Sequence, residues 1–110
     1  MKIIKRSGSE AVYDSNKIIA AVQKANASVI DYEKLSDEQI KEIADNVETA
    51  CENMKRSPSV EEIQDMVENQ LMNKRAFTVA RNYITYRYKR ALVRKSNSTD
   101  QQILSLLECN

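Results

Sequence analysis

Apolar residues recur at helical spacing along most of the chain and predict four amphipathic helices. The strongest stripe lies between residues 36 and 54 and comprises Ile40, Ile43, Ala44, Val47, Ala50, Cys51 and Met54. Ser36 and Gln39 stand at the spacing of a capping box and predict where this helix begins. Shorter stripes predict helices over residues 15–25, 60–71 and 75–95, the first capped by Asp14 or Ser15 and the second by Ser59.

The N-terminal residues follow a different pattern, which predicts two short strands. Residues 2–6 and 11–13 are β-prone, and the turn between them holds Gly8, the only glycine. A lone hairpin is marginal in water, so we expect it to pack against the helices. One Gly and one Pro in the whole chain leave little room for an all-β fold. The pattern therefore predicts a mainly helical α+β domain with a hairpin across one end.

The length of 110 residues and the apolar content of 42% suit one domain with a small core. No apolar run reaches the roughly 20 residues that span a bilayer, and the N-terminus lacks the apolar region of a signal peptide. We therefore expect a cytoplasmic protein with no membrane partner.

The residue types present exclude several kinds of catalytic and metal site. The chain has no histidine, which excludes Ser-His-Asp triads and His-ligated metals. Two cysteines cannot complete a tetrahedral zinc site, so we expect no zinc. Cys51 is expected to be a reduced core thiol and Cys109 an exposed thiol near the C-terminus.

The net charge of +1 hides a strong segregation of charge along the chain. Residues 31–69 carry 4 basic and 12 acidic side chains, whereas residues 70–95 carry 8 basic and no acidic ones. Residues 1–30 carry 5 basic and 2 acidic side chains. The basic segments either define a local anion site or pair with the acidic middle of the chain.

The cations nearest the N-terminus form the first candidate site. Lys5 and Arg6 end the first predicted strand, and Lys17 opens the first predicted helix. A helix N-terminus favours an anion, and an arginine fork can hold a phosphate in two hydrogen bonds. The alternative is a basic edge strand that prevents sheet pairing. The sequence has neither a GxxxxGK[ST] nor a GxGxxG motif, so a glycine-cradled phosphate site is not expected.

The last predicted helix is strongly basic, with tyrosines interleaved at positions 83, 86 and 88. Its cations are Lys74, Arg75, Arg81, Arg87, Lys89, Arg90, Arg94 and Lys95. These cations are open to three interpretations. They could contact nucleic acid, or one face of the helix could close the phosphate site while another face meets an acidic partner. In the third interpretation they form a solvated surface or pair with acidic residues.

Four blocks of sequence, in order and at matching spacing, resemble the ATP-cone. They are residues 3–8 (IIKRSG), 13–18 (YDSNKI), 57–64 (SPSVEEIQ) and 80–90 (ARNYITYRYKR). The ATP-cone is a small nucleotide-binding regulatory domain at the N-terminus of many ribonucleotide reductases and in the reductase-operon repressor. The resemblance covers residues 2–95. Residues 99–107 also resemble the segment that leads into the catalytic body of anaerobic, glycyl-radical reductases, whereas the repressor's zinc ribbon is absent.

The resemblance implies a four-helix bundle capped by a small three-stranded sheet, with Arg56 and Ser57 in the third strand. It also implies a set of residues that surround the nucleotide. In that set, phosphate contacts come from Lys5, Arg6, Lys17 and Lys89, Asp14 faces the nucleotide with Ile3 nearby, and Ser57 and Glu61 lie near the adenine.

We therefore expect residues 1–95 to be a regulatory domain, not itself an enzyme, and residues 96–110 to lead toward a catalytic body. The domain would bind ATP or dATP with Mg²⁺. ATP would keep an attached ribonucleoside-triphosphate reductase active, and dATP would inhibit it through the catalytic domain and further cone copies. The alternatives are a nucleic-acid-binding helical module, a repressor-type ATP-cone and a docking domain that binds neither ligand.

Overall fold

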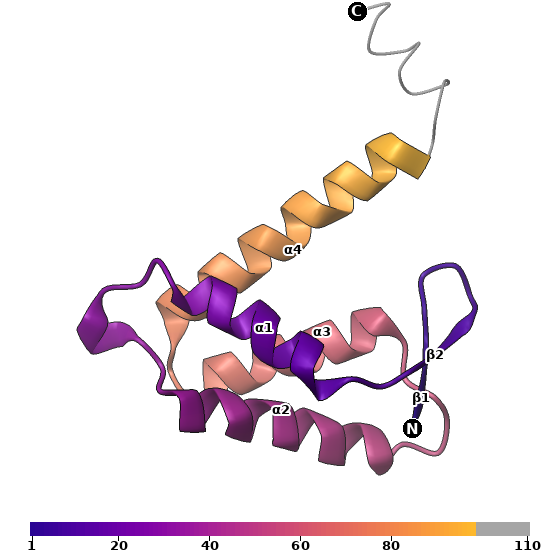
Figure 1. Cartoon of the computed structure of the whole chain (residues 1–110), viewed down its shortest axis with the longest axis horizontal. Coiled ribbons are helices and arrows are strands. Elements are labelled where there is room, and N and C mark those ends of the chain that lie inside the picture. Colours follow the sequence, from indigo (N-terminus) through magenta and orange to yellow (C-terminus); the bar gives the residue numbers. More distant parts are fainter. Residues whose placement is uncertain (99–110) are drawn as a thin grey trace, which may run out of the picture.

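The computed structural model describes the backbone of residues 1–98 and the side chains of residues 1–95. The expectations for residues 99–107 and Cys109 lie outside this part of the chain. The elements are β1 (Lys2–Ile4), β2 (Glu10–Val12), α1 (Ser15–Asn26), the short 3-10 helix η1 (Asp31–Glu33), α2 (Asp37–Glu52), α3 (Val60–Asn73) and α4 (Phe77–Ser98). The mainly helical α+β fold with four α-helices is confirmed (Figure 1).

The predicted hairpin is present; β1 ends two residues earlier than expected, and β2 has the expected length but begins one residue earlier. β1 and β2 pair antiparallel, with Ile3 opposite Ala11. The backbone enters the turn after Ile4, because the Lys5 N–H donates to the Ser9 carbonyl over 2.8 Å and its own carbonyl accepts from the Gly8 N–H over 2.9 Å. Gly8 has a φ of +88°, which glycine adopts without steric cost.

The third strand implied at Arg56 and Ser57 is not formed within the described residues, where the sheet has two strands. The chain instead makes one isolated parallel bridge between Ile4 and Ser59, and the Ile4 N–H donates to the Pro58 carbonyl over 2.8 Å. Pro58 has no N–H to continue a ladder, and Ser59 already caps α3. The segment therefore leaves the sheet after a single contact, which nevertheless ties the hairpin to the start of α3.

The predicted helix starts at the caps are confirmed. Asp14 caps α1 through the N–H of Asn16, and complete capping boxes begin α2 at Ser36 and α3 at Ser59. α4 begins at Phe77, two residues later than expected, because Arg75 has a φ of +58° and turns the chain in the left-handed region.

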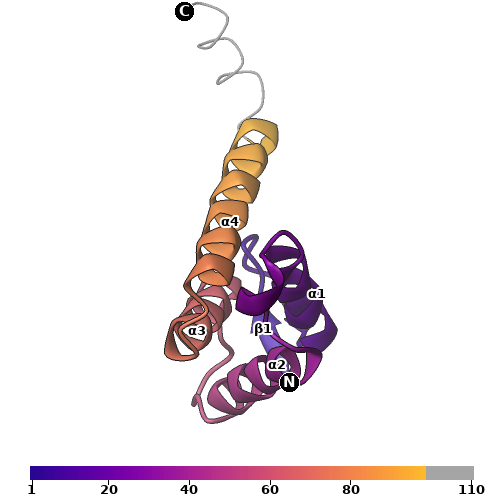
Figure 2. The ribbon, with the colours of Figure 1, turned by 90° about the vertical axis from the view of Figure 1, so that its left-hand side faces the viewer.

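The four helices contact one another in a circuit: α1 packs on α2 and α4, and α3 packs on the same two helices (Figure 2). The largest fully buried side chains include Val22, Ile40, Ile43, Val47, Val67, Leu71 and Val79. Cys51 is a buried free thiol, as predicted, and burial raises its pKa.

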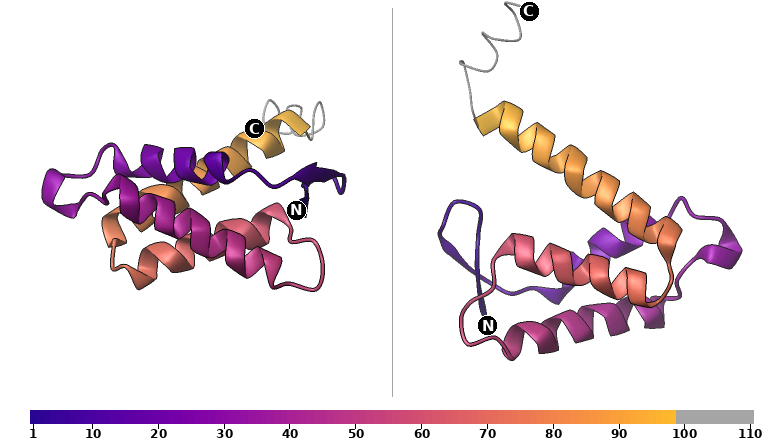
Figure 3. Two further views of the ribbon diagram at one scale, coloured as in Figure 1. Left: turned by 60° about the horizontal axis from the view of Figure 1, so that its bottom comes forward. Right: turned by 180° about the vertical axis from the view of Figure 1, so that it is seen from behind.

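α4 contributes only its first half to this core. Val79, Ala80 and Tyr83 in this first half are buried. In the second half, Tyr88 and Val93 are more than half exposed and Leu92 is nearly half exposed. The second half of the helix projects past the other helices on the side where the hairpin lies, so the helices do not form a bundle over its whole length (Figures 1 and 3). None of the helices within residues 1–98 is long and apolar enough to cross a membrane.

Replacing Ile43 by alanine tests the position of the core. Ile43 is fully buried in α2, so Ile43→Ala should lower the free energy of unfolding by about 2–5 kcal/mol in urea titrations. Lys41→Ala, on the exposed face of the same helix, should change it by less than about 0.5 kcal/mol. Equal effects of the two substitutions would contradict the burial described for α2.

Candidate functional site

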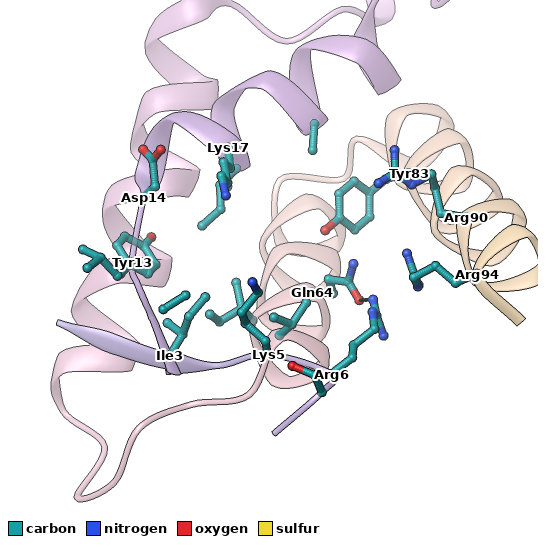
Figure 4. Close-up of a pocket in the computed structure, with 17 residues that line it drawn as sticks. Ile3, Lys5, Arg6, Tyr13, Asp14, Lys17, Gln64, Tyr83, Arg90 and Arg94 are labelled. Carbon is teal, nitrogen blue, oxygen red and sulfur yellow. Dashed lines mark hydrogen bonds between the residues drawn. The ribbon is translucent and has the colours of Figure 1, made fainter. Parts of the chain in front are cut away.

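A cavity of about 580 Å³ lies where the hairpin, α1, α3 and α4 face one another (Figure 4). The hairpin lines one side with Ile3, Lys5 and Arg6, and the start of α1 lines another with Asp14 and Lys17. α3 and α4 close the remaining sides. The cavity is of the size that small-molecule sites usually have.

Cations from three separate elements reach this cavity. Lys5 and Arg6 come from the end of β1, Lys17 from α1, and Arg90 and Arg94 from the projecting half of α4 (Figure 4). The convergence of the first three, predicted from the sequence, is present. Because side chains of one sign converge in a hollow, their field attracts an anion of several charges.

Apolar side chains complete the lining: Ile3, Ala11, Val12, Ile18, Ala21, Val60 and Ile63. Tyr83 adds an aromatic ring from α4, and burial raises the pKa of its hydroxyl to about 12, so it stays protonated at neutral pH. A cavity with an apolar wall and a cluster of cations suits a ligand that has both a flat apolar part and a polyanionic part.

Asp14 has a structural role in addition to its place in the lining. Its carboxylate accepts a hydrogen bond from the Asn16 N–H over 3.0 Å and so caps α1. The end of this helix is therefore partly occupied by an acidic side chain, which weakens its attraction for an anion. The basic side chains, rather than the helix end, give this cavity its positive character.

Arg6 is held by two residues of α3. It forms an ion pair with Glu61, and its second terminal nitrogen donates to the Gln64 side chain over 3.1 Å. Burial, followed by the nearby guanidinium groups of Arg94, Arg87 and Arg90, lowers the pKa of Arg6. Arg6 therefore lies in a positive field that its one carboxylate partner does not cancel.

The structure brings five of the eight residues of the predicted site into the lining, namely Ile3, Lys5, Arg6, Asp14 and Lys17. Glu61 contacts the cavity only through Arg6. Ser57 lies outside the lining, beside the bridge that joins the hairpin to α3. Lys89 is exposed and also lies outside it, because successive helical residues point about 100° apart.

Gln64, Tyr83, Arg90 and Arg94 also line the cavity, although they are not among the eight residues predicted from the sequence. Gln64 lies within one of the blocks that resemble the ATP-cone, and Tyr83 is one of the tyrosines interleaved in the basic helix. A signal for the arginines was available: Tyr83, Arg87, Arg90 and Arg94 follow one another at spacings of four, three and four, and so share one helix face.

A second hollow of about 450 Å³ adjoins the first and shares Lys17, Arg90 and Arg94 with it. Lys24 donates to the Tyr86 hydroxyl over 2.7 Å and lies 4.2 Å from the centre of its ring. This hydrogen bond, with a second one from Arg90, lowers the pKa of Tyr86. Two cations of this hollow therefore have an aromatic partner.

Part of the basic face of α4 pairs with acidic residues of α3. The Arg87 guanidinium donates to Asp65 over 2.8 Å and to Glu68, one turn further along the same helix. The interpretation of the basic helix as acid-paired is thus correct for Arg87. Arg90 and Arg94, one and two turns further on, face the cavity.

The start of α3, which forms one wall of the cavity, is held by a second arginine. Arg56 donates two hydrogen bonds to the Glu62 carboxylate, over 2.8 and 2.6 Å, and the same carboxylate accepts from the Ser59 N–H over 3.0 Å. The Arg56 contact, with the Ser59 backbone, lowers the pKa of Glu62 to about 2. The described residues contain no group of three Cys, Asp or Glu side chains placed to hold a metal ion.

Comparison with known proteins identifies the family. The family description "ATP cone domain" matches residues 1–92. The chain is 38% identical over 104 residues to a vitamin B12-dependent ribonucleoside-diphosphate reductase of Thermoplasma acidophilum. The alignment covers 86% of this chain and 12% of that protein. The chain is also 34% identical over 108 residues to an anaerobic ribonucleoside-triphosphate reductase of Haemophilus influenzae, covering 96% of this chain and 15% of that protein.

A third relative is a ribonucleoside-diphosphate reductase subunit alpha of Chlamydia trachomatis, 32% identical over 108 residues that cover 91% of this chain and 10% of that protein. The chain therefore spans only 10–15% of the length of these relatives. The fold and the family match together define a small regulatory domain of the kind found in ribonucleotide reductases. The chain belongs to the ATP-cone family.

The Arg56–Glu62 pair should give folding stability a specific pH dependence. The pKa of Glu62 is lower in the folded chain than its ordinary value of 4.5, so ionised Glu62 stabilises the fold at any pH above 4.5. This contribution is lost as the pH falls toward 2. Urea midpoints measured between pH 6 and 2 should fall more steeply for the native chain than for Glu62→Gln. Parallel pH profiles for the two proteins would contradict this role for the pair.

Proposed function

We propose that this chain is a nucleotide-sensing regulatory domain that binds ATP or dATP in the cavity between the hairpin and α4. The observation that carries this proposal is the convergence of Lys5, Arg6, Lys17, Arg90 and Arg94 on a cavity that also has an apolar wall. The family match supports a nucleotide as the ligand.

The phosphates lie among these five cations in our proposal, and the base and sugar lie against the apolar side chains, with Ile3 and Asp14 nearby. Arginine can hold a phosphate through two parallel N–H bonds, whereas lysine acts as a mobile point charge. Mg²⁺ usually keeps several waters and binds through substrate phosphates, so it would arrive with the nucleotide. In this proposal, Arg90 and Arg94 make the phosphate contacts from α4 that the family resemblance implied for Lys89.

Because the relatives of this chain are ribonucleotide reductases, we propose that the regulated protein is also a ribonucleotide reductase, with its catalytic domain attached to the cone. ATP keeps it active and dATP inhibits it in this proposal, which requires that the two nucleotides interact differently with two states of the assembly, including contacts with further cone copies. The resemblance of residues 99–107 favours a ribonucleoside-triphosphate reductase as the parent.

The alternative of a nucleic-acid-binding helix has less support. Arg90 and Arg94 face the cavity, and Arg87 is paired with Asp65 and Glu68. The arginines on this face thus either line a hollow between elements or pair with acidic side chains of α3, which suits a small anion held between elements better than a duplex lying along the helix.

Calorimetric titration with ATP, dATP and GTP, each with Mg²⁺, tests the proposal. We expect the adenine nucleotides to bind more tightly than GTP. Arg6→Ala should weaken ATP binding about 10- to 100-fold, because hydrogen bonds between charged groups contribute roughly 1.5–3 kcal/mol. The Lys5→Ala variant should show a loss in the same direction.

Lys2→Ala is the matched control, since Lys2 lies on β1 a few residues before Arg6, is exposed and does not line the cavity. Its affinity should equal that of the native chain. No binding of any nucleotide to the native chain, or equal binding by the Lys2 and Arg6 variants, would sink the proposal.

A further inference from the structure

Arg6 differs from the other cations of the cavity in having a carboxylate partner. Within the described part of the chain, Lys5, Lys17, Arg90 and Arg94 form no ion pair with an acidic side chain, whereas Arg6 pairs with Glu61. The partner comes from α3, 55 positions away in the sequence, and is therefore brought to Arg6 by the fold. The pair joins the end of the hairpin to the first turn of α3.

Glu61 and Gln64 together occupy the face of Arg6 that a phosphate would use. Glu61 holds one terminal nitrogen of the guanidinium and Gln64 holds the other. A phosphate that binds Arg6 through both nitrogens needs the same two positions. A phosphate that binds end-on through both terminal nitrogens therefore competes with the Glu61 carboxylate for Arg6.

The exchange is sterically accessible. The side chains of Arg6 and Glu61 are 33% and 46% exposed, so neither is locked inside the core. The neighbouring Glu62 performs the structural work at this helix start, since it completes the capping box and holds Arg56. Glu61 has no part in that cap, so we expect Glu61→Gln to leave the start of α3 folded.

We propose that Glu61 is an internal competitor for the nucleotide phosphates, which weakens binding at Arg6 and so sets the nucleotide concentration at which the cavity fills. The proposal rests on the proposed function and concerns the regulation of the same site. Five converging cations would hold a polyphosphate tightly and release it slowly. A carboxylate that rebinds Arg6 when the phosphate leaves favours release, and a sensor must release its ligand to respond to a change in concentration.

The test compares the native chain with Glu61→Gln, Arg6→Ala and the double variant, each titrated with ATP and with inorganic triphosphate. Glu61→Gln should tighten the binding of both ligands about two- to fivefold, the upper part of the range expected when a partly exposed ion pair no longer has to be broken. In the Arg6→Ala background the same substitution should give no gain, because the competition acts through Arg6.

Asp65→Asn is the matched control. It also removes one negative charge from the same face of α3, one turn further on, but from a carboxylate that pairs with Arg87. Its effect on ATP affinity should be less than about twofold, since Arg87 keeps Glu68 and lies outside the first cavity.

Each other outcome overturns the proposal in a recognisable way. Unchanged affinity in Glu61→Gln shows that the carboxylate does not compete, and an equal gain in the Arg6→Ala background shows only a general effect of charge. Weaker binding of ATP but not of triphosphate would place Glu61 against the base or sugar. In all three cases the native chain still binds ATP, so the proposed function survives; a native chain that binds neither ligand removes both.

Discussion

The hydrogen bond from the Ile4 N–H to the Pro58 carbonyl is the contact on which the site depends. A two-stranded hairpin has little stability of its own, and this bond, with the bridge between Ile4 and Ser59, attaches it to the start of α3. The attachment places Lys5 and Arg6 beside the cavity immediately after the bonded residue. The Ser59 capping box and the Arg56–Glu62 pair in turn hold the start of α3.

The segregation of charge along the sequence has two results in the fold. Some cations of the basic segment meet the acidic middle of the chain: Lys74 pairs with Glu42, and Arg87 with Asp65. Arg90 and Arg94 of α4 instead leave an excess of positive charge around a hollow. A helix that is almost uniformly basic therefore stabilises the fold through one part of its length and attracts an anion through another.

The sequence predicted the features that depend on local chemistry. Both capping boxes, the amphipathic faces and the convergence of Lys5 with Lys17 follow from short-range spacing, and all are present. It did not predict features that depend on contacts between distant segments. Within the part of the chain that the structure describes, the third strand is not formed, because Pro58 and the Ser59 cap end the ladder after one bond. The pairing of Arg6 with Glu61 joins residues that no local pattern connects. The resemblance implied a phosphate contact from Lys89, whereas the phase of the helix places its neighbour Arg90 in the lining of the cavity.

The projecting half of α4 gives the domain a mechanical property. Tyr83 is buried in the core, and about 22 Å of helix extends from it to Ser98 at 1.5 Å per residue. Arg90 and Arg94 lie along this extension, so any force that a bound anion exerts on them acts at a distance from the pivot. A tilt of roughly 10° about the buried half displaces the far end of the helix by about 4 Å over that length. The length of the projecting half would therefore amplify a small tilt at the core into a displacement at Ser98 that is comparable to the width of a side chain.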